Sequence, residues 1–144
     1  MLVQQILKSK SSDTVYTVKP GTLVRDAAQL LAENRIGTVI VSASGDTADG
    51  ILSERDIVRE LAARGGTCLN DKIDEYMTAN PFTCKLSESA DEVLQRMTDG
   101  RFRHMPVVED GKLIGLITLG DAVKARLSQL SMEKDALQGM IMGH

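Results

Sequence analysis

The sequence predicts an α+β fold built from two copies of one unit, each running strand, helix, strand, strand, helix. Three observations support this prediction. An apolar stripe at helical spacing occurs once in each half of the chain, a short β-branched run follows each stripe, and a Ser/Thr-x-x-Asp pattern closes each copy. The pattern consists of Ser53 and Asp56 in the first copy and of Thr118 and Asp121 in the second. One copy alone would leave an apolar sheet face bare, so we expect the two to pack face to face.

The helices are predicted from apolar residues at i, i+3, i+4 and i+7. Thr22 and Ser87 precede the two stripes and are the expected N-caps. Asn34 and Gly100 tolerate a left-handed turn and are the expected ends. The stripe residues are Val24, Ala27, Ala28 and Leu31 in the first copy and Ala90, Val93, Leu94 and Met97 in the second.

Short runs rich in β-branched residues predict the strands. Asp110-Gly111 is a hairpin signal between the last two of them. The expected strands are residues 15–18, 38–41 and 50–53 in the first copy and 81–84, 105–108 and 114–118 in the second.

These elements divide the chain into residues 1–64 as the first repeat with an N-terminal segment, 65–76 as a linker, 77–128 as the second repeat and 129–144 as a helical extension. The linker is rich in Gly and polar residues, which suits a segment that lets one repeat swing against the other. The extension continues an apolar stripe through Val123, Leu127 and Leu130, which indicates a subunit contact.

Composition narrows the function classes. The chain has 144 residues, 42% of them hydrophobic, and a net charge of −3 at pH 7, so it can bury a core but offers no basic surface for nucleic acid. No apolar stretch approaches the roughly 18 residues of a membrane span, and the N-terminus lacks the order of a secretory signal. Cys68, Cys84 and His104 lack the spacing of a metal or redox site. We therefore expect a cytoplasmic protein without metal that binds neither nucleic acid nor membrane.

The Ser/Thr-x-x-Asp pattern has two interpretations. It is the pattern of a capping box at a helix N-terminus. A carboxylate in the first turn of a helix can also accept both vicinal hydroxyls of a ribose, while the Ser or Thr hydroxyl binds another part of the ligand. The two roles are compatible.

A second feature is the cluster Arg101, Arg103 and His104 before a buried strand. It is either a solvated loop or an anion clamp, because Arg offers a planar fork of donors to a phosphate and His adds another donor. The first copy has Gly37 and Thr38 at the corresponding place. There, Gly37 either lets the backbone approach a flat ligand such as a base or simply starts a strand.

Two such units, with "GILSERD" and "GLITLGD" at their ends, resemble a pair of CBS domains across about residues 13–128. The resemblance implies a Bateman module, in which two βαββα repeats pack about a pseudo-twofold axis. It also implies two clefts that bind adenosine-containing ligands such as AMP, ADP, ATP, NAD or S-adenosylmethionine. Such modules commonly form disc-like homodimers and regulate an effector protein.

The family's binding positions carry over to two sets of residues. One cleft would combine Ser53 and Asp56 with Thr83, Arg103 and His104. The other would combine Thr118 and Asp121 with Thr17, Ile36, Gly37 and Thr38.

The function expected from these observations is a non-enzymatic regulatory module. An adenine nucleotide, AMP first and ATP or NAD next, would act as a regulatory ligand and not as a required cofactor. The expected partners are a second copy of the chain, in a homodimer, and an effector protein that the sequence does not identify. The alternative is a dimerisation or interaction module that binds no nucleotide. An enzyme is disfavoured because no nucleophile with a base, no paired carboxylates and no Gly-rich phosphate loop occur at a recognisable spacing.

Overall fold

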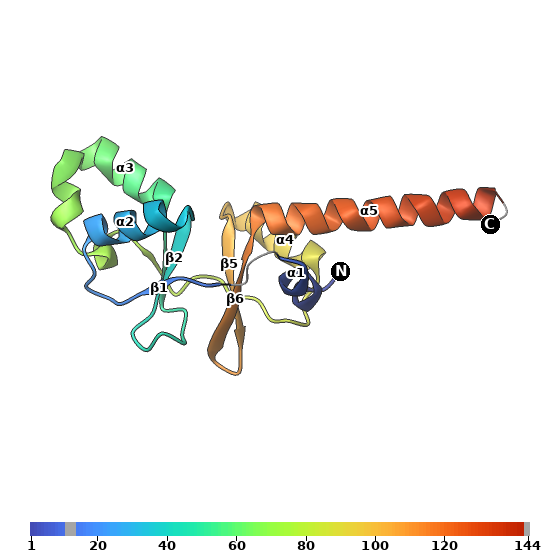
Figure 1. Ribbon diagram of the computed structural model, residues 1–144, viewed down its shortest axis with the longest axis horizontal. Helices are drawn as coiled ribbons and strands as arrows, with labels where there is room; N and C mark the ends of the chain where they lie inside the picture. Colours follow the sequence, from blue (N-terminus) through green and yellow to red (C-terminus); the bar gives the residue numbers. More distant parts are fainter. Residues whose placement is uncertain (11–13, 143–144) are drawn as a thin grey trace.

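Two sheets form the centre of the molecule, and the helices cover their outer sides (Figure 1). The computed structural model describes residues 1–10 and 14–142. The predicted α+β fold of two similar repeats is confirmed. The helices are α1 (Val3–Ser9), α2 (Val24–Asn34), α3 (Glu54–Arg64), α4 (Ala90–Gly100) and α5 (Leu119–Ile141), with short 3-10 helices η1 (Gly65–Asn70) and η2 (Ile73–Glu75).

The strands form one sheet of four and one of two. In the first sheet β1 runs parallel to β2, while β2–β3 and β3–β4 are antiparallel. In the second, β5 and β6 form a hairpin whose turn residues Asp110 and Gly111 have φ values of 50° and 77°, as the Asp-Gly signal predicts. The strands are β1 (Thr17–Val18), β2 (Thr38–Val41), β3 (Gly50–Ser53), β4 (Thr78–Ala79), β5 (His104–Glu109) and β6 (Lys112–Thr118).

The strand predicted over residues 81–84 is wrong. Only Cys84 pairs there, in an isolated parallel bridge to Val107, because Pro81 has no N–H to donate and the segment is short. The strand predicted over residues 15–18 is reduced to its second half, Thr17–Val18. Both segments still lie parallel to the neighbouring strand of their repeat, β2 in the first and β5 in the second, and form backbone hydrogen bonds with it.

The helices form where the stripes predict them and end at the predicted residues Asn34 and Gly100, but both predicted N-caps are displaced. Leu23, not Thr22, is the N-cap of α2, and the Thr22 hydroxyl instead donates to the carbonyl of Lys19 at 2.6 Å. Ser89, not Ser87, caps α4 and accepts from the N–H of Glu92 at 3.1 Å. The left-handed residues that follow α2 and α4 are the arginines Arg35 and Arg101, with φ values of 53° and 56°.

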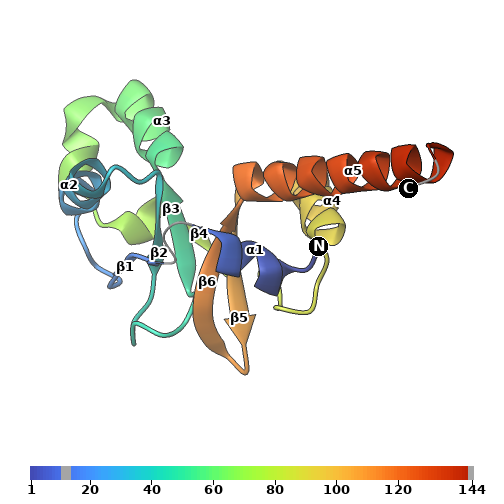
Figure 2. The same cartoon turned by 45° about the vertical axis from the view of Figure 1, so that its right-hand side comes forward.

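Each repeat takes one segment from elsewhere in the chain to complete its core. Val3 and Ile6 of α1 are buried in the core of the second repeat, beside β6 and α4 (Figures 1 and 2). Ile73 of η2 is buried in the core of the first repeat, and its N–H donates to the carbonyl of Thr22 at 2.8 Å. The segment 65–76, which was expected to be a linker, thus packs onto the first repeat.

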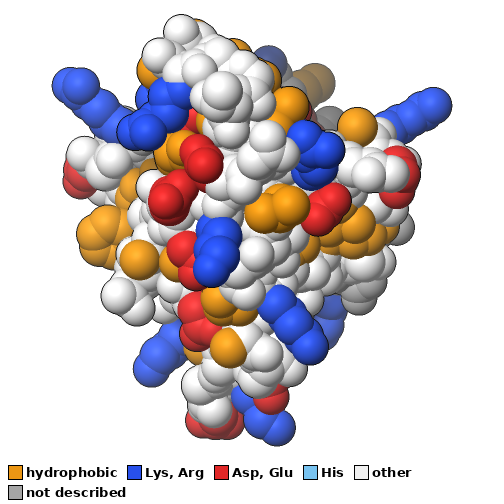
Figure 3. All heavy atoms as spheres, turned by 90° about the vertical axis from the view of Figure 1, so that its left-hand side faces the viewer, with side chains coloured by type: hydrophobic (Ala, Val, Ile, Leu, Met, Phe, Trp, Pro, Cys, Tyr) orange, Lys and Arg blue, Asp and Glu red, His pale blue; other side chains and the backbone are white. Residues whose placement is uncertain are grey.

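The last helix extends well beyond the body of the second repeat (Figure 1). Its apolar side chains include Leu127 at 62% exposure and Met140 at 77%. On the face formed by α2 and α3, acidic and basic side chains are mixed and neither sign dominates (Figure 3). Within residues 1–10 and 14–142, no helix has the length and apolar character needed to cross a bilayer.

Candidate functional site

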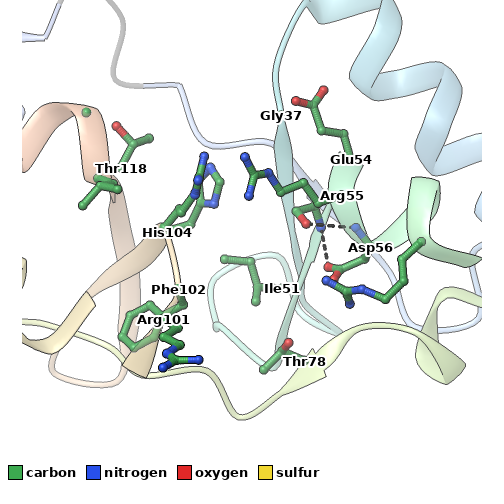
Figure 4. Close-up of a pocket in the computed structure, with 15 residues that line it drawn as sticks. Gly37, Ile51, Glu54, Arg55, Asp56, Thr78, Arg101, Phe102, His104 and Thr118 are labelled. Atoms are coloured by element: carbon green, nitrogen blue, oxygen red, sulfur yellow. Dashed lines mark hydrogen bonds and ion pairs between the residues drawn. The ribbon is translucent and has the colours of Figure 1, made fainter. Parts of the chain in front are cut away.

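A cavity of about 590 Å³ opens between the two repeats (Figure 4). One wall is the junction of β3 with α3, and the other combines the start of β5 with the junction of β6 and α5. The cavity is lined by Gly37, Ile51, Ser53, Glu54, Arg55, Asp56, Arg59, Thr78, Arg101, Phe102, Arg103, His104, Thr118, Leu119 and Gly120. Four of the five residues predicted for this cleft, Ser53, Asp56, Arg103 and His104, therefore meet here. Gly37 and Thr118, which were predicted for the other cleft, line this cavity as well.

Asp56 lies in the first turn of α3 and closes a capping box with Ser53. Its Oδ2 accepts from the Ser53 N–H at 2.9 Å, and the Ser53 Oγ accepts from the Asp56 N–H at 3.2 Å. Arg59 approaches Oδ1 at 3.3 Å with a side chain that is 70% exposed. A carboxylate has about four acceptor sites, so the cap leaves acceptor capacity on the cavity side. The cap interpretation is confirmed, and the cavity beside the carboxylate leaves the ligand interpretation open.

Cationic side chains converge on this cavity from both repeats. Arg101, Arg103 and His104 come from the second repeat, and Arg55 and Arg59 from the first. Figure 4 shows Arg55 and His104 extending toward each other from opposite walls. The lining contains two carboxylates and four arginines, so positive groups outnumber negative ones. This local excess suits a phosphate, although the chain as a whole has a net negative charge.

Two features of the site lower the pKa of His104. Burial is the largest influence and lowers its pKa below the ordinary value, and the neighbouring Arg103 guanidinium lowers the pKa further. A phosphate placed between these two residues would remove part of the repulsion.

Phe102 gives the cavity an aromatic wall. Its ring stacks on that of Phe82, with centroids 5.4 Å apart and an interplanar angle of 12°. The Phe102 ring also lies against Gly100, where an added Cβ would overlap a ring carbon. Gly100 is therefore required by packing and not by its backbone angle. At Gly37, by contrast, an added Cβ would lie 3.6 Å from Glu54, an ordinary contact.

The second junction repeats the backbone geometry of the first. Asp121 Oδ2 accepts from the Thr118 N–H at 2.9 Å, and Thr118 Oγ1 accepts from the Asp121 N–H at 3.0 Å. Here Lys10 Nζ also donates to the same Oδ2, at 2.8 Å. Burial alone would raise the pKa of Asp121, but the hydrogen bonds from Lys10 and from Thr118 outweigh burial and lower it.

The residues predicted for the second cleft are divided between two hollows. Thr118, Ile36, Gly37 and Thr38 line one of about 330 Å³, together with Tyr16, His104 and Lys10. Asp121 lines a neighbouring hollow of about 340 Å³ with Lys10 and Lys124. Among the residues that the structure describes, Thr38 Oγ1 is a buried hydroxyl without a hydrogen-bond partner.

Thr17 and Thr83 lie outside these hollows. Thr17 is paired with Ile40 in the sheet, and the carbonyl of Thr83 accepts from Arg96 at 2.8 Å. Two arginines and one aromatic residue are among the lining residues that were not predicted as binding residues. Arg55 stands inside the Ser-x-x-Asp pattern, Arg59 lies one turn further along α3, and Phe102 stands between the two arginines of the cationic cluster.

Comparison with known proteins matches both halves of the chain to the same protein family. The CBS domain model matches twice, at residues 4–63 and 73–128. The chain is 38% identical to the CBS-domain containing protein ATU1752 from Agrobacterium tumefaciens, whose crystal structure superposes with a TM-score of 0.81 over 88% of this chain and 99% of that one. It is 26% identical to the CBS domain pair of protein MJ0100, with a TM-score of 0.75 over 90% of this chain and 98% of that one. That pair was solved in complex with 5′-methylthioadenosine and S-adenosyl-L-methionine.

A curated relative is considerably longer. The CBS domain-containing protein CBSCBSPB2 of Arabidopsis thaliana is 32% identical over 136 residues, which cover 94% of this chain and 25% of the relative. The chain thus spans about a quarter of the length of that protein.

Proposed function

Because this chain belongs to the CBS-domain family, we propose that it is a non-enzymatic regulatory module that binds an adenosine-containing nucleotide between its two repeats. The nucleotide lies in the cavity at Asp56, with its ribose hydroxyls donating to that carboxylate and its phosphate on the cationic cluster. Binding favours one relative orientation of the repeats or subunits, and an effector protein responds to it. AMP is the first candidate ligand, with ADP, ATP and NAD next.

The single observation that carries the proposal is the composition of one cavity. A carboxylate with free acceptor sites stands on one wall, and Arg101, Arg103 and His104 stand on the other. A nucleotide needs both features at once, since its ribose donates hydrogen bonds and its phosphate accepts them. A helix cap alone accounts for Asp56 but leaves the facing cations without a role.

The solved relative with bound adenosyl compounds supports the ligand class. MJ0100, at 26% identity, holds 5′-methylthioadenosine and S-adenosyl-L-methionine. These two compounds share the adenine and ribose of AMP and lack its phosphate. We therefore include S-adenosylmethionine in the set to be tested, while the arginines in this cavity favour a phosphorylated ligand.

The test is a thermal unfolding series with AMP, ADP, ATP, NAD and S-adenosylmethionine. A ligand at about 100 times its dissociation constant stabilises the folded state by roughly 2.7 kcal/mol, which raises Tm by several degrees. The Asp56→Asn variant should lose this rise, because an amide accepts ribose hydroxyls less well than a carboxylate. Asp26→Asn is the matched control, since Asp26 is an exposed acid in the first turn of α2.

A second candidate function is dimerisation without nucleotide. It is favoured by the exposed apolar residues of α3 and α5, among them Val58 at 62% and Leu127 at 62%. Homodimer formation is compatible with either function. An absence of any Tm rise with all five ligands, together with a dimer in analytical ultracentrifugation, would leave this second function in place of the first.

A further inference from the structure

Lys10 ties the N-terminal segment to the second junction. Its Nζ donates to Asp121 Oδ2 at 2.8 Å and to the carbonyl of Leu116 at 2.9 Å. The side chains of Lys10 and Asp121 are each 22% exposed. The two residues are 111 positions apart, so this ion pair is a tertiary contact that holds the C-terminal end of α1 against β6 and α5.

Lys10 also lies between two hollows. It lines the one of about 330 Å³ that holds Thr38 and the one of about 340 Å³ that holds Asp121. The Thr38 hydroxyl is buried without a partner in the described part of the chain, and a buried polar group in that state favours a ligand or water beside it. An unused hydroxyl and a carboxylate acceptor thus lie on either side of one lysine side chain.

Among the residues that the structure describes, no lysine contacts the acid of the first junction. The side-chain partner of Asp56 is Arg59, which is 70% exposed and 3.3 Å away. An exposed ion pair of this kind contributes little, so Arg59 can turn aside for a ligand. Displacing Lys10 instead breaks two shorter hydrogen bonds and leaves a half-buried carboxylate without its counterion.

From this difference we infer that Lys10 occupies the Asp121 carboxylate as an internal ligand and restricts nucleotide binding to the cavity at Asp56. The inference rests on the proposed function, which it refines: one chain takes one nucleotide although both junction acids are present. The lysine ammonium stands where ribose hydroxyls would donate, and its side chain separates Asp121 from the hollow at Thr38. Lys10 therefore determines how many clefts are filled.

The test is calorimetric titration of wild type and Lys10→Met with AMP and, separately, with S-adenosylmethionine. Wild type should bind one molecule per chain, and Lys10→Met should bind two. Adding Asp121→Asn to Lys10→Met should restore one molecule per chain. Lys8→Met is the matched control, because it removes the same charge from an exposed position of α1, and it should bind one.

Two further variants keep the test valid if Lys10→Met does not fold. Lys10→Gln retains a polar side chain and should also bind two molecules. Asp121→Asn in the wild-type background should leave the stoichiometry at one and the dissociation constant within about twofold, equivalent to roughly 0.4 kcal/mol.

The outcomes separate this inference from the function on which it rests. One molecule per chain in both wild type and the Lys10 variants would overturn the role of Lys10 alone, and so would two in wild type. Absence of binding by every protein to both compounds would overturn the proposed function and the inference with it.

Discussion

His104 and Thr118 are directly paired across β5 and β6, and both residues line the cavity at Asp56 as well as the hollow at Thr38. The hairpin that carries this pair therefore forms a wall shared by the two candidate binding regions. A ligand on one side contacts the same two residues that border the other side.

Nucleotide binding should be coupled to the protonation of His104. Its lowered pKa in the free protein should rise when a phosphate joins Arg103 and His104, so AMP binding near pH 6 takes up protons at this site. The AMP phosphate also titrates, with a pKa of about 6. The measurement is therefore the difference in proton uptake between wild type and His104→Gln, obtained by calorimetry in buffers of different ionisation enthalpy. Equal uptake by both proteins would contradict the coupling.

The same pKa shift affects the stability of the free protein. Because the folded-state pKa lies below that of the unfolded chain, the unfolded chain binds the proton more readily. The contribution of His104 is therefore lost as pH falls from about 6.5 through the folded-state pKa. Urea unfolding should show a smaller loss over this range for His104→Gln than for wild type.

Asp121 should make the stability of wild type depend on pH in the acidic range, below that in which His104 acts. Its folded-state pKa is lowered, so the stabilisation is present above the ordinary pKa of about 4 and is lost as pH falls through the folded value. Lys10→Met removes a partly exposed ion pair and should lower the free energy of unfolding at pH 7 by about 1 kcal/mol. The difference between the two proteins should shrink below pH 4. A constant difference across this range would contradict the role given to the pair.

Comparing two serine N-caps distinguishes the capping role of Ser53 from a role in ligand binding. Ser53 and Ser89 accept from the backbone of the third helical residue at 3.2 and 3.1 Å, but only Ser53 lines the cavity. Replacing either one by Ala should cost about 1 kcal/mol of stability. Only Ser53→Ala should also weaken AMP binding. Equal AMP affinities in the two variants would show that the Ser53 hydroxyl does not contact the ligand.

The cationic cluster should provide the preference for a phosphorylated ligand. A charge-assisted hydrogen bond contributes roughly 1.5–3 kcal/mol, so wild type should bind AMP more tightly than adenosine by a factor of about ten to a hundred. Arg103→Gln should reduce this ratio, whereas Arg25→Gln, exposed on α2 and hydrogen-bonded to Asn70, should preserve it. Competition binding at fixed ionic strength measures the ratio. An unchanged ratio in Arg103→Gln would place the phosphate elsewhere.

Gly100 should tolerate no larger side chain. An added Cβ would overlap the ring of Phe102, so Gly100→Ala should destabilise the protein by about 1–3 kcal/mol through overpacking and move the ring that walls the cavity. Gly66 has no atom within 4 Å of an added Cβ and serves as the control. Chemical denaturation of both variants checks this. A Gly100→Ala protein as stable as wild type would contradict the packing role.

The two repeats and most of their elements could be predicted because they depend on local periodicity. The helices α2 and α4 follow from the spacing of their apolar residues, and the strands β2, β3, β5 and β6 follow from short apolar runs. The helix starts were less predictable, because backbone groups from distant segments satisfy them. Val24 N–H donates to the carbonyl of Asp71, and Ala90 N–H donates to the carbonyl of Met1.

The candidate site was predictable only in part for a similar reason. Ser53, Asp56, Arg103 and His104 follow from local patterns, and the fold brings them to one cavity. Lys10 reaches Asp121 across 111 positions, and no local pattern signals such a contact.

The central claim is that the Asp56 carboxylate accepts the ribose hydroxyls of a nucleotide. The measurement that tests it most directly compares the affinities of AMP and 2′,3′-dideoxy-AMP for wild type and for Asp56→Asn. Wild type should prefer AMP by about tenfold or more, since each charge-assisted hydrogen bond contributes roughly 1.5–3 kcal/mol, and Asp56→Asn should lose most of that preference. The same preference in both proteins would contradict the claim.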